Sequence, residues 1–103
     1  MNTLPDTFIG RASQKNWTFT KVKREGRVAI YSKTTPDIST TYYETVVINV
    51  HNGYKLGGVQ FPPGETYPGD GMFGISGWCY NELEKAEQKF TQLLEYHATK
   101  NKN

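Results

Sequence analysis

Cysteine and histidine are scarce in this chain of 103 residues: it has one cysteine, Cys79, and two histidines, His51 and His97. A single thiol cannot close an internal disulfide, so we expect a protein of a reducing compartment. Metal sites need ligands in clusters, and these three residues do not have the spacing of any such motif. The sequence therefore predicts no bound metal and no other cofactor.

Long apolar runs are also missing, because no stretch approaches the ~20 residues that cross a bilayer. Residues 1–6 have neither the basic nor the apolar region of a secretion signal. We therefore expect a cytoplasmic protein without a membrane partner. Large rings, in contrast, are plentiful: seven Tyr, five Phe and two Trp are more than a disordered chain carries. The length matches one folded domain.

The apolar pattern predicts an α+β fold, an antiparallel meander of about five strands packed against one C-terminal amphipathic helix. Apolar and β-branched residues alternate as they do in strands over residues 17–24, 27–33, 42–50, 54–61 and 72–80. From residue 82 to about residue 99, apolar residues recur at spacings of three and four, which is typical of a helix. One helix covers one face of such a sheet, so we expect the other face to be free for recognition.

The domain organisation follows from this pattern. Residues 17–99 are expected to form a single α+β domain. Residues 1–16 show no clean period and are expected to be an N-terminal arm, with Phe8 and Ile9 docked on the domain. Residues 100–103 are expected to be a frayed tail.

Glycine and proline mark the expected turns. Asn52-Gly53 predicts a two-residue hairpin turn. Gly57-Gly58 falls inside the expected strand 54–61, where it indicates a bulge or a close approach of another backbone. Residues 34–41 are expected to be a loop, and residues 62–71, with three prolines, a stiff one.

No catalytic constellation emerges from the sequence, so we expect a protein that is not an enzyme. Cys79 lies between two aromatic residues and is expected to be a small buried hydrophobe. Three carboxylates, Glu44, Glu65 and Asp70, are candidates for an acid–base pair, but their spacing does not require one.

Tyrosines near the loops are the candidates for a protein-binding surface. Tyr42, Tyr54 and Tyr67 are expected to be exposed, and tyrosine buries area at low entropic cost while keeping a hydrogen-bonding tip. Glu65 and Asp70 lie in the stiff loop and complete this candidate surface.

The positive charge is concentrated at the N-terminal end. Residues 1–33 carry seven bases and two acids, whereas residues 34–103 carry five bases and eight acids. An excess of this kind steers anionic partners, which makes nucleic-acid binding the alternative function; strand edges also use such charges against aggregation. The candidate phosphate contacts are Lys21, Lys23, Arg24 and Arg27.

Three packing motifs follow one another along the chain: Tyr42-Tyr43-Glu44-Thr45-Val46-Val47-Ile48, Phe73-Gly74-x-x-Gly77-Trp78-x-Tyr80 and Leu83-Glu84-x-Ala86-x-x-x-Phe90-x-x-Leu93. Over residues 24–94 their order resembles that of small accessory proteins encoded by phages and other mobile elements. The resemblance implies a non-catalytic protein that binds and modulates a host or defence-system protein in the host cytoplasm.

Residues 73–77 are also similar to the Trp-Gly-Arg-Val-Gly motif of the WGR domain, a sheet-and-helix module of enzymes that respond to DNA ends. Here the motif is Phe73-Gly74-Ile75-Ser76-Gly77. Both the Trp and the Arg of the family are missing, so its DNA contact cannot be transferred to any residue of this chain.

The nucleic-acid alternative predicts a measurable salt dependence. If the four basic residues contact about four phosphates, log affinity falls against log salt concentration with a slope of about −3 to −4. Titration of single- and double-stranded DNA and RNA at two salt concentrations measures this slope, and a flat response excludes this mode of binding.

Overall fold

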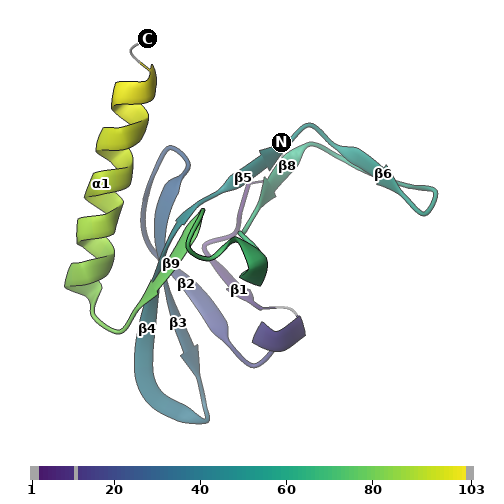
Figure 1. Cartoon of the computed structure of the whole chain (residues 1–103). Helices are drawn as coiled ribbons and strands as arrows, with labels where there is room; N and C mark the ends of the chain where they lie inside the picture. Colours follow the sequence, from purple (N-terminus) through teal and green to yellow (C-terminus); the bar gives the residue numbers. More distant parts are fainter. Residues whose placement is uncertain (1–2, 11, 102–103) are drawn as a thin grey trace.

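The computed structural model describes residues 3–10 and 12–101 and confirms the α+β fold (Figure 1). Five antiparallel strands form one sheet in the order β1-β2-β3-β4-β9, and one helix, α1, packs against it. The bounds are β1 (Thr7–Ile9), β2 (Thr18–Glu25), β3 (Val28–Thr35), β4 (Ile38–Val47), β9 (Gly77–Tyr80) and α1 (Leu83–Asn101). In the described residues no helix combines the length and apolarity needed to cross a membrane.

Part of the expected N-terminal arm belongs to the sheet. Thr7–Ile9, within the expected arm, pairs with β2 as the edge strand, and the Phe8 ring stacks on Phe19 at 5.0 Å. The Ile9 side chain is exposed. Residues 102–103 of the expected frayed tail lie outside the described residues.

Strands β2, β3 and β4 form the centre of the sheet, and their side chains point alternately to its two faces. Gly26 forms the β2–β3 turn with a φ of 60°, which glycine adopts without strain. The loop expected over residues 34–41 was wrong, because β3 runs to Thr35 and β4 begins at Ile38. The β-branched residues there favour extended backbone, which leaves only Pro36 and Asp37 for the turn.

One face of the sheet is covered by α1, as expected. Ala86, Phe90 and Leu93 are buried against Val28 and Ile30. The Thr45 hydroxyl, itself fully buried, donates a hydrogen bond of 2.8 Å to the Ala86 carbonyl oxygen. This bond satisfies a buried polar group and holds the helix over β4.

The opposite face is covered too, so the expectation that it stays free was wrong. Alternate residues of the same strands, together with the residue that follows β4, form a second buried cluster: Phe19, Ala29, Tyr31, Val46 and Ile48. Four partly buried side chains lie over it: Leu4, Phe8, Trp17 and Tyr67. The N-terminal segment and the chain after Glu65 return across this face, and the apolar residues of both are buried there.

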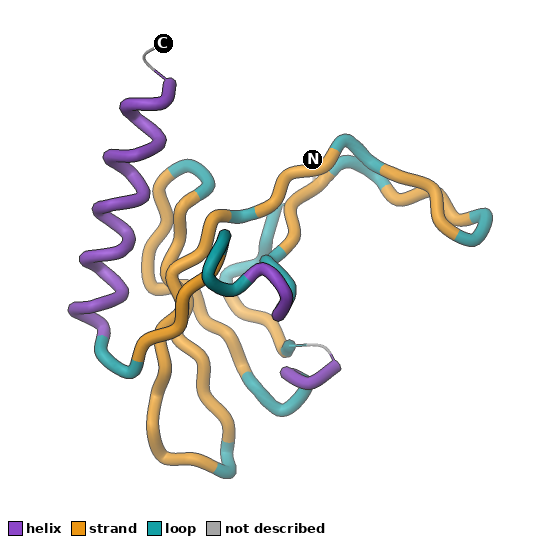
Figure 2. The backbone as a smooth tube through the Cα atoms, in the orientation of Figure 1, coloured by secondary structure: helices purple, strands orange, loops and turns teal. Residues whose placement is uncertain are grey.

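One of the expected strands, residues 54–61, is not a strand of this sheet. Residues 49–66 leave it as a long two-stranded projection (Figure 2). Its inner part pairs β5 (Asn49–His51) with β8 (Gly64–Thr66), and its outer part pairs β6 (Tyr54–Leu56) with β7 (Val59–Phe61). We call residues 54–61 the ribbon.

The hairpin turn is Gly57-Gly58 and not Asn52-Gly53. Both glycines have positive φ, 58° and 80°, as a two-residue type I′ turn requires. A turn at residues 52–53 would return residues 54–61 toward β4, whose two edges are already paired with β3 and β9.

The strand expected over residues 72–80 is shorter than predicted. Only Gly77–Tyr80 is strand, and it is preceded by a single 3-10 turn, η2 (Asp70–Met72), and a bend at Gly74 with a φ of 95°. The glycines of this segment favour turns over pairing.

We expect Phe90→Ala to lower the free energy of unfolding by about 3–5 kcal/mol, because it opens a cavity between α1 and the sheet. Gln92→Ala, on the exposed side of the same helix, serves as the control and should change it by less than about 0.5 kcal/mol. Urea denaturation followed by circular dichroism measures both. Equal midpoints for Phe90→Ala and the parent would contradict the packing described here.

Candidate functional site

The ribbon carries an apolar face that is largely exposed; in the described chain, the His51 ring contacts its Tyr54 end. Pairing of Tyr54 with Phe61 and of Leu56 with Val59 places these four side chains on one face. Their exposed fractions are 47% for Tyr54, 37% for Phe61, 67% for Leu56 and 56% for Val59. The rings of Tyr54 and Phe61 stack with centroids 4.8 Å apart. Contiguous exposed apolar residues of this kind mark interaction surfaces.

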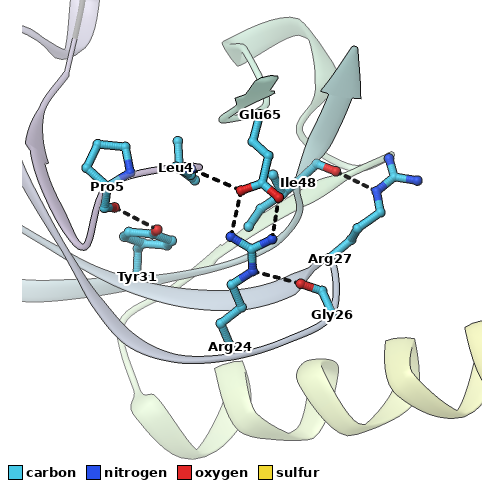
Figure 3. Close-up of polar contacts among 8 residues, drawn as sticks. All are labelled: Leu4, Pro5, Arg24, Gly26, Arg27, Tyr31, Ile48 and Glu65. Carbon is cyan, nitrogen blue, oxygen red and sulfur yellow. Dashed lines mark hydrogen bonds and ion pairs between the residues drawn. The ribbon is translucent and has the colours of Figure 1, made fainter. Parts of the chain in front are cut away.

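The base of the ribbon is held to the body by Glu65. Arg24 donates two hydrogen bonds to its carboxylate, Nη1 to Oε1 at 2.8 Å and Nη2 to Oε2 at 2.6 Å, and the Leu4 backbone N–H donates a third to Oε1 at 3.0 Å (Figure 3). The Glu65 side chain is only 9% exposed. We call this arrangement the Glu65 latch; it joins β8, β2 and the N-terminal segment.

The charges of the latch stabilise each other. The hydrogen bonds from Arg24 lower the pKa of Glu65 to about 2, although burial acts in the opposite direction. The same contact raises the pKa of Arg24. A second arginine, Arg27, donates from Nε to the Ile48 carbonyl oxygen at 2.8 Å, where the chain enters β5 (Figure 3). Both arginines therefore hold the ribbon at its base.

The basic residues of the first hairpin do not form a common surface. A register shift between Lys21 and Lys23 turns these two side chains to opposite faces of the sheet. Lys21 pairs with Asp6 at 2.8 Å, and Lys23 pairs with Glu87 of α1 at 3.2 Å. With Arg24 and Arg27 bound to the ribbon base, all four candidate phosphate contacts have partners within the chain.

A hollow of about 750 Å³ lies on the sheet face opposite α1. Its apolar walls come from the N-terminal segment, β2 and the chain on either side of η2, and include Leu4, Phe8, Phe19, Pro68 and Phe73. Lys33, Glu44 and Cys79 contribute polar atoms to the lining. This volume lies in the range of ligand-binding cavities.

The polar groups of the hollow are paired with each other. Lys33 Nζ donates to Gln14 Oε1 at 2.6 Å and to Glu44 Oε2 at 3.2 Å. The Tyr67 hydroxyl donates to Glu44 Oε1 at 2.8 Å. Burial, followed by the Glu44 charge, raises the pKa of Tyr67, so this hydroxyl stays protonated and remains a donor. Lys33 and Glu44 neutralise each other, which leaves the hollow apolar in character.

Cys79 is exposed in this hollow, and the expectation that it is buried was wrong. β9 is an edge strand of the sheet. On the sheet face away from α1, the side chain of Cys79 therefore remains exposed to solvent. The protein atoms around the thiol, followed by the Glu44 carboxylate, raise its pKa. A raised pKa keeps the sulfur protonated and a weak nucleophile at neutral pH.

The remaining predicted site residues are scattered. Tyr42 is half-buried against the Trp17 ring, 5.8 Å between centroids. Tyr67 was expected to be exposed and is instead half-buried, in edge contact with the Tyr31 ring. Only Tyr54 lies on the ribbon's open face, and the side chain of Asp70 lies outside what the structure describes.

The sequence analysis missed Leu56, Val59 and Phe61, although a signal for them was present. Apolar residues alternate on both sides of Gly57-Gly58, the pattern of a hairpin with one apolar face. Among the side chains described, no group of three or more His, Cys, Asp or Glu residues could hold a metal ion. Comparisons with protein families, with characterised proteins and with solved structures found no match.

We expect Glu65→Gln to lower the free energy of unfolding at neutral pH by about 2–3 kcal/mol, because it leaves Arg24 without its carboxylate. The pKa of Glu65 is lowered from 4.5 to about 2. Its contribution is therefore complete above pH 4.5 and is lost as the pH falls toward 2.

Thermal unfolding of the parent and of Glu65→Gln across this pH range measures the effect, and the two curves should converge in acid. Glu82→Gln is the matched control, since its pair with Lys85 is exposed and 3.9 Å long. A constant difference between parent and Glu65→Gln at every pH would contradict the role of the carboxylate charge.

Proposed function

We propose that this chain is a non-catalytic accessory protein that binds another protein through the apolar face of the ribbon. One observation carries the proposal: four large apolar side chains, including Leu56 and Tyr54, stand exposed together on one face of a hairpin. A two-stranded hairpin is marginally stable in water unless its apolar face is packed. Covering this face gains roughly 25 cal/mol per Å² of apolar area.

The body of the protein presents the ribbon in a defined orientation. The Glu65 latch and the Arg27–Ile48 bond fix its base. At Gly53, an added Cβ would lie 2.9 Å from the Phe61 carbonyl oxygen, so the two strands meet closely there. A surface that is already ordered binds with a smaller loss of conformational entropy, which supports a role in recognition.

The resemblance of residues 24–94 to phage and mobile-element accessory proteins supports a host or defence-system protein as the partner, in the host cytoplasm. The apolar face calls for a hydrophobic groove or an exposed sheet edge on that partner. Glu65 acts in this proposal by orienting the ribbon and not by touching the partner, because its oxygens are occupied.

Nucleic-acid binding stays a prediction with its own salt titration. Its support is weaker than the composition implied, since Lys21, Lys23, Arg24 and Arg27 all have internal partners. For Lys21, Lys23 and Arg24, contact with phosphates would compete with these ion pairs.

Substitutions on the ribbon test the proposal. A photo-crosslinking amino acid at position 56, introduced in the cells in which the protein acts, should form a covalent bond to the partner. Mass spectrometry of the crosslinked product then identifies that partner. With the purified partner, we expect Tyr54→Ala to weaken binding about 10-fold or more, as truncating an aromatic anchor does.

Lys55→Ala, on the ribbon's other face, and Ile75→Ala, an exposed apolar residue away from it, are the controls. Both should bind as the parent does in calorimetric titration. Equal losses for all three variants would contradict a specific ribbon surface.

A further inference from the structure

The ribbon and the hollow are two apolar surfaces on the same side of the sheet. In Figure 1 the ribbon extends outward from β5 and β8 on the side of the sheet away from α1, and the N-terminal segment with β1 lies on that side too. Residues of this segment line the hollow. Phe8 and Phe73 lie in the wall of the hollow, and Leu56 and Val59 lie on the face of the ribbon.

We propose that the hollow receives the ribbon of a second copy of this chain, and that two copies exchange ribbons about a twofold axis. This inference rests on one part of the proposed function, the binding of a protein by the apolar face of the ribbon, and it names a second copy of this chain as that protein. Each copy both offers a ribbon and accepts one, so the contact occurs twice and the assembly closes as a dimer.

The ribbon cannot fill the hollow of its own chain. Its base is held by the Glu65 latch and by Arg27, which direct it away from the body. The principal extents of 42 × 41 × 22 Å and a radius of gyration of 14.6 Å show how far the molecule extends. A compact domain of this length has a radius of about 13 Å. A ribbon that fills this hollow must therefore come from another molecule.

The two surfaces match in chemistry. The apolar face of the ribbon carries no charged side chain. In the hollow, Lys33 and Glu44 neutralise each other, so the hollow does not need a charged ligand. The aromatic walls of the hollow suit the rings of Tyr54 and Phe61, which pack favourably edge to face.

Area favours reciprocal exchange over simple contact of two ribbons. The exposed parts of the four ribbon side chains amount to roughly 400 Å² per copy, so face-to-face ribbons would bury roughly 800 Å² in total. Stable interfaces bury about 1,200–2,000 Å². Exchange also covers the lining of a hollow on each copy, which brings the total to roughly 1,200 Å², the lower end of that range.

The single cysteine allows a direct test. Cys79 lines the hollow and is exposed. In Leu56→Cys, oxidation with copper phenanthroline and air removes two electrons and two protons from a pair of thiols. We expect a disulfide between position 56 of one copy and Cys79 of the other. Because the Cys79 pKa is raised, the reaction is run at alkaline pH.

Lys55→Cys, on the opposite face of the ribbon, is the matched control. Tryptic mass spectrometry should find the 56–79 link in a covalent dimer and little or no 55–79 link. Equal yields from the two variants, or links only between two copies of Cys79, would overturn ribbon exchange.

Sedimentation equilibrium of the full chain in reducing buffer gives an independent answer. We expect twice the chain mass of 11.7 kDa for the parent, for Lys55→Asp and for Ile75→Asp. Leu56→Asp, which charges the ribbon, and Cys79→Arg, which fills the hollow, should both be monomers. A parent that stays monomeric at several hundred micromolar would overturn the inference. Leu56→Asp and Cys79→Arg variants that both remain dimers would overturn it as well.

These outcomes separate this inference from the proposed function. A monomeric parent whose foreign partner is lost on Tyr54→Ala overturns ribbon exchange and leaves the protein-binding role in place. A dimer disrupted by Leu56→Asp, with no foreign protein captured at position 56, supports ribbon exchange and overturns the host-binding role.

Discussion

The buried carboxylate of Glu65 connects three parts of the chain that are far apart in sequence. It accepts hydrogen bonds from Arg24 in β2 and from the Leu4 backbone, 41 and 61 residues away. These contacts orient the ribbon and place the N-terminal segment that walls the hollow. A buried ionised group is stable only when its hydrogen-bonding partners are in place. Glu65 therefore couples the position of the ribbon to that of the N-terminal segment beside the hollow.

Because both faces of the sheet are largely buried, little of the sheet is available for contact with a partner. Tyr31 and Ile30 are neighbours in β3 and point to opposite faces, yet both are fully buried. The first belongs to the aromatic cluster under the N-terminal segment, and the second packs under α1. A central strand covered on both sides offers little to a partner. Outside the two cores, exposed apolar side chains gather on the face of the ribbon.

The candidate site was predicted only in part, for physical reasons. Composition locates charge and rings but does not show what they contact. Arg24 and Glu65 were assigned to different hypothetical surfaces, and in the structure they hold each other at 2.6 Å. Tyr67 lies in the expected proline-rich loop, residues 62–71, where exposure is the usual state, but its ring packs on Tyr31. Tyr54 is exposed, as expected, because strand alternation is local.

Local periodicity was sufficient for the helix, whose apolar stripe through Ala86 and Phe90 meets the sheet as expected. This stripe depends on residues a few positions apart, so the order of amino acids decides it. Sheet membership depends instead on competition between distant segments. β9 takes the free edge of β4, and residues 54–61 pair with themselves through Gly57-Gly58. Only the folded chain settles that competition, because each edge of a strand has room for a single neighbour.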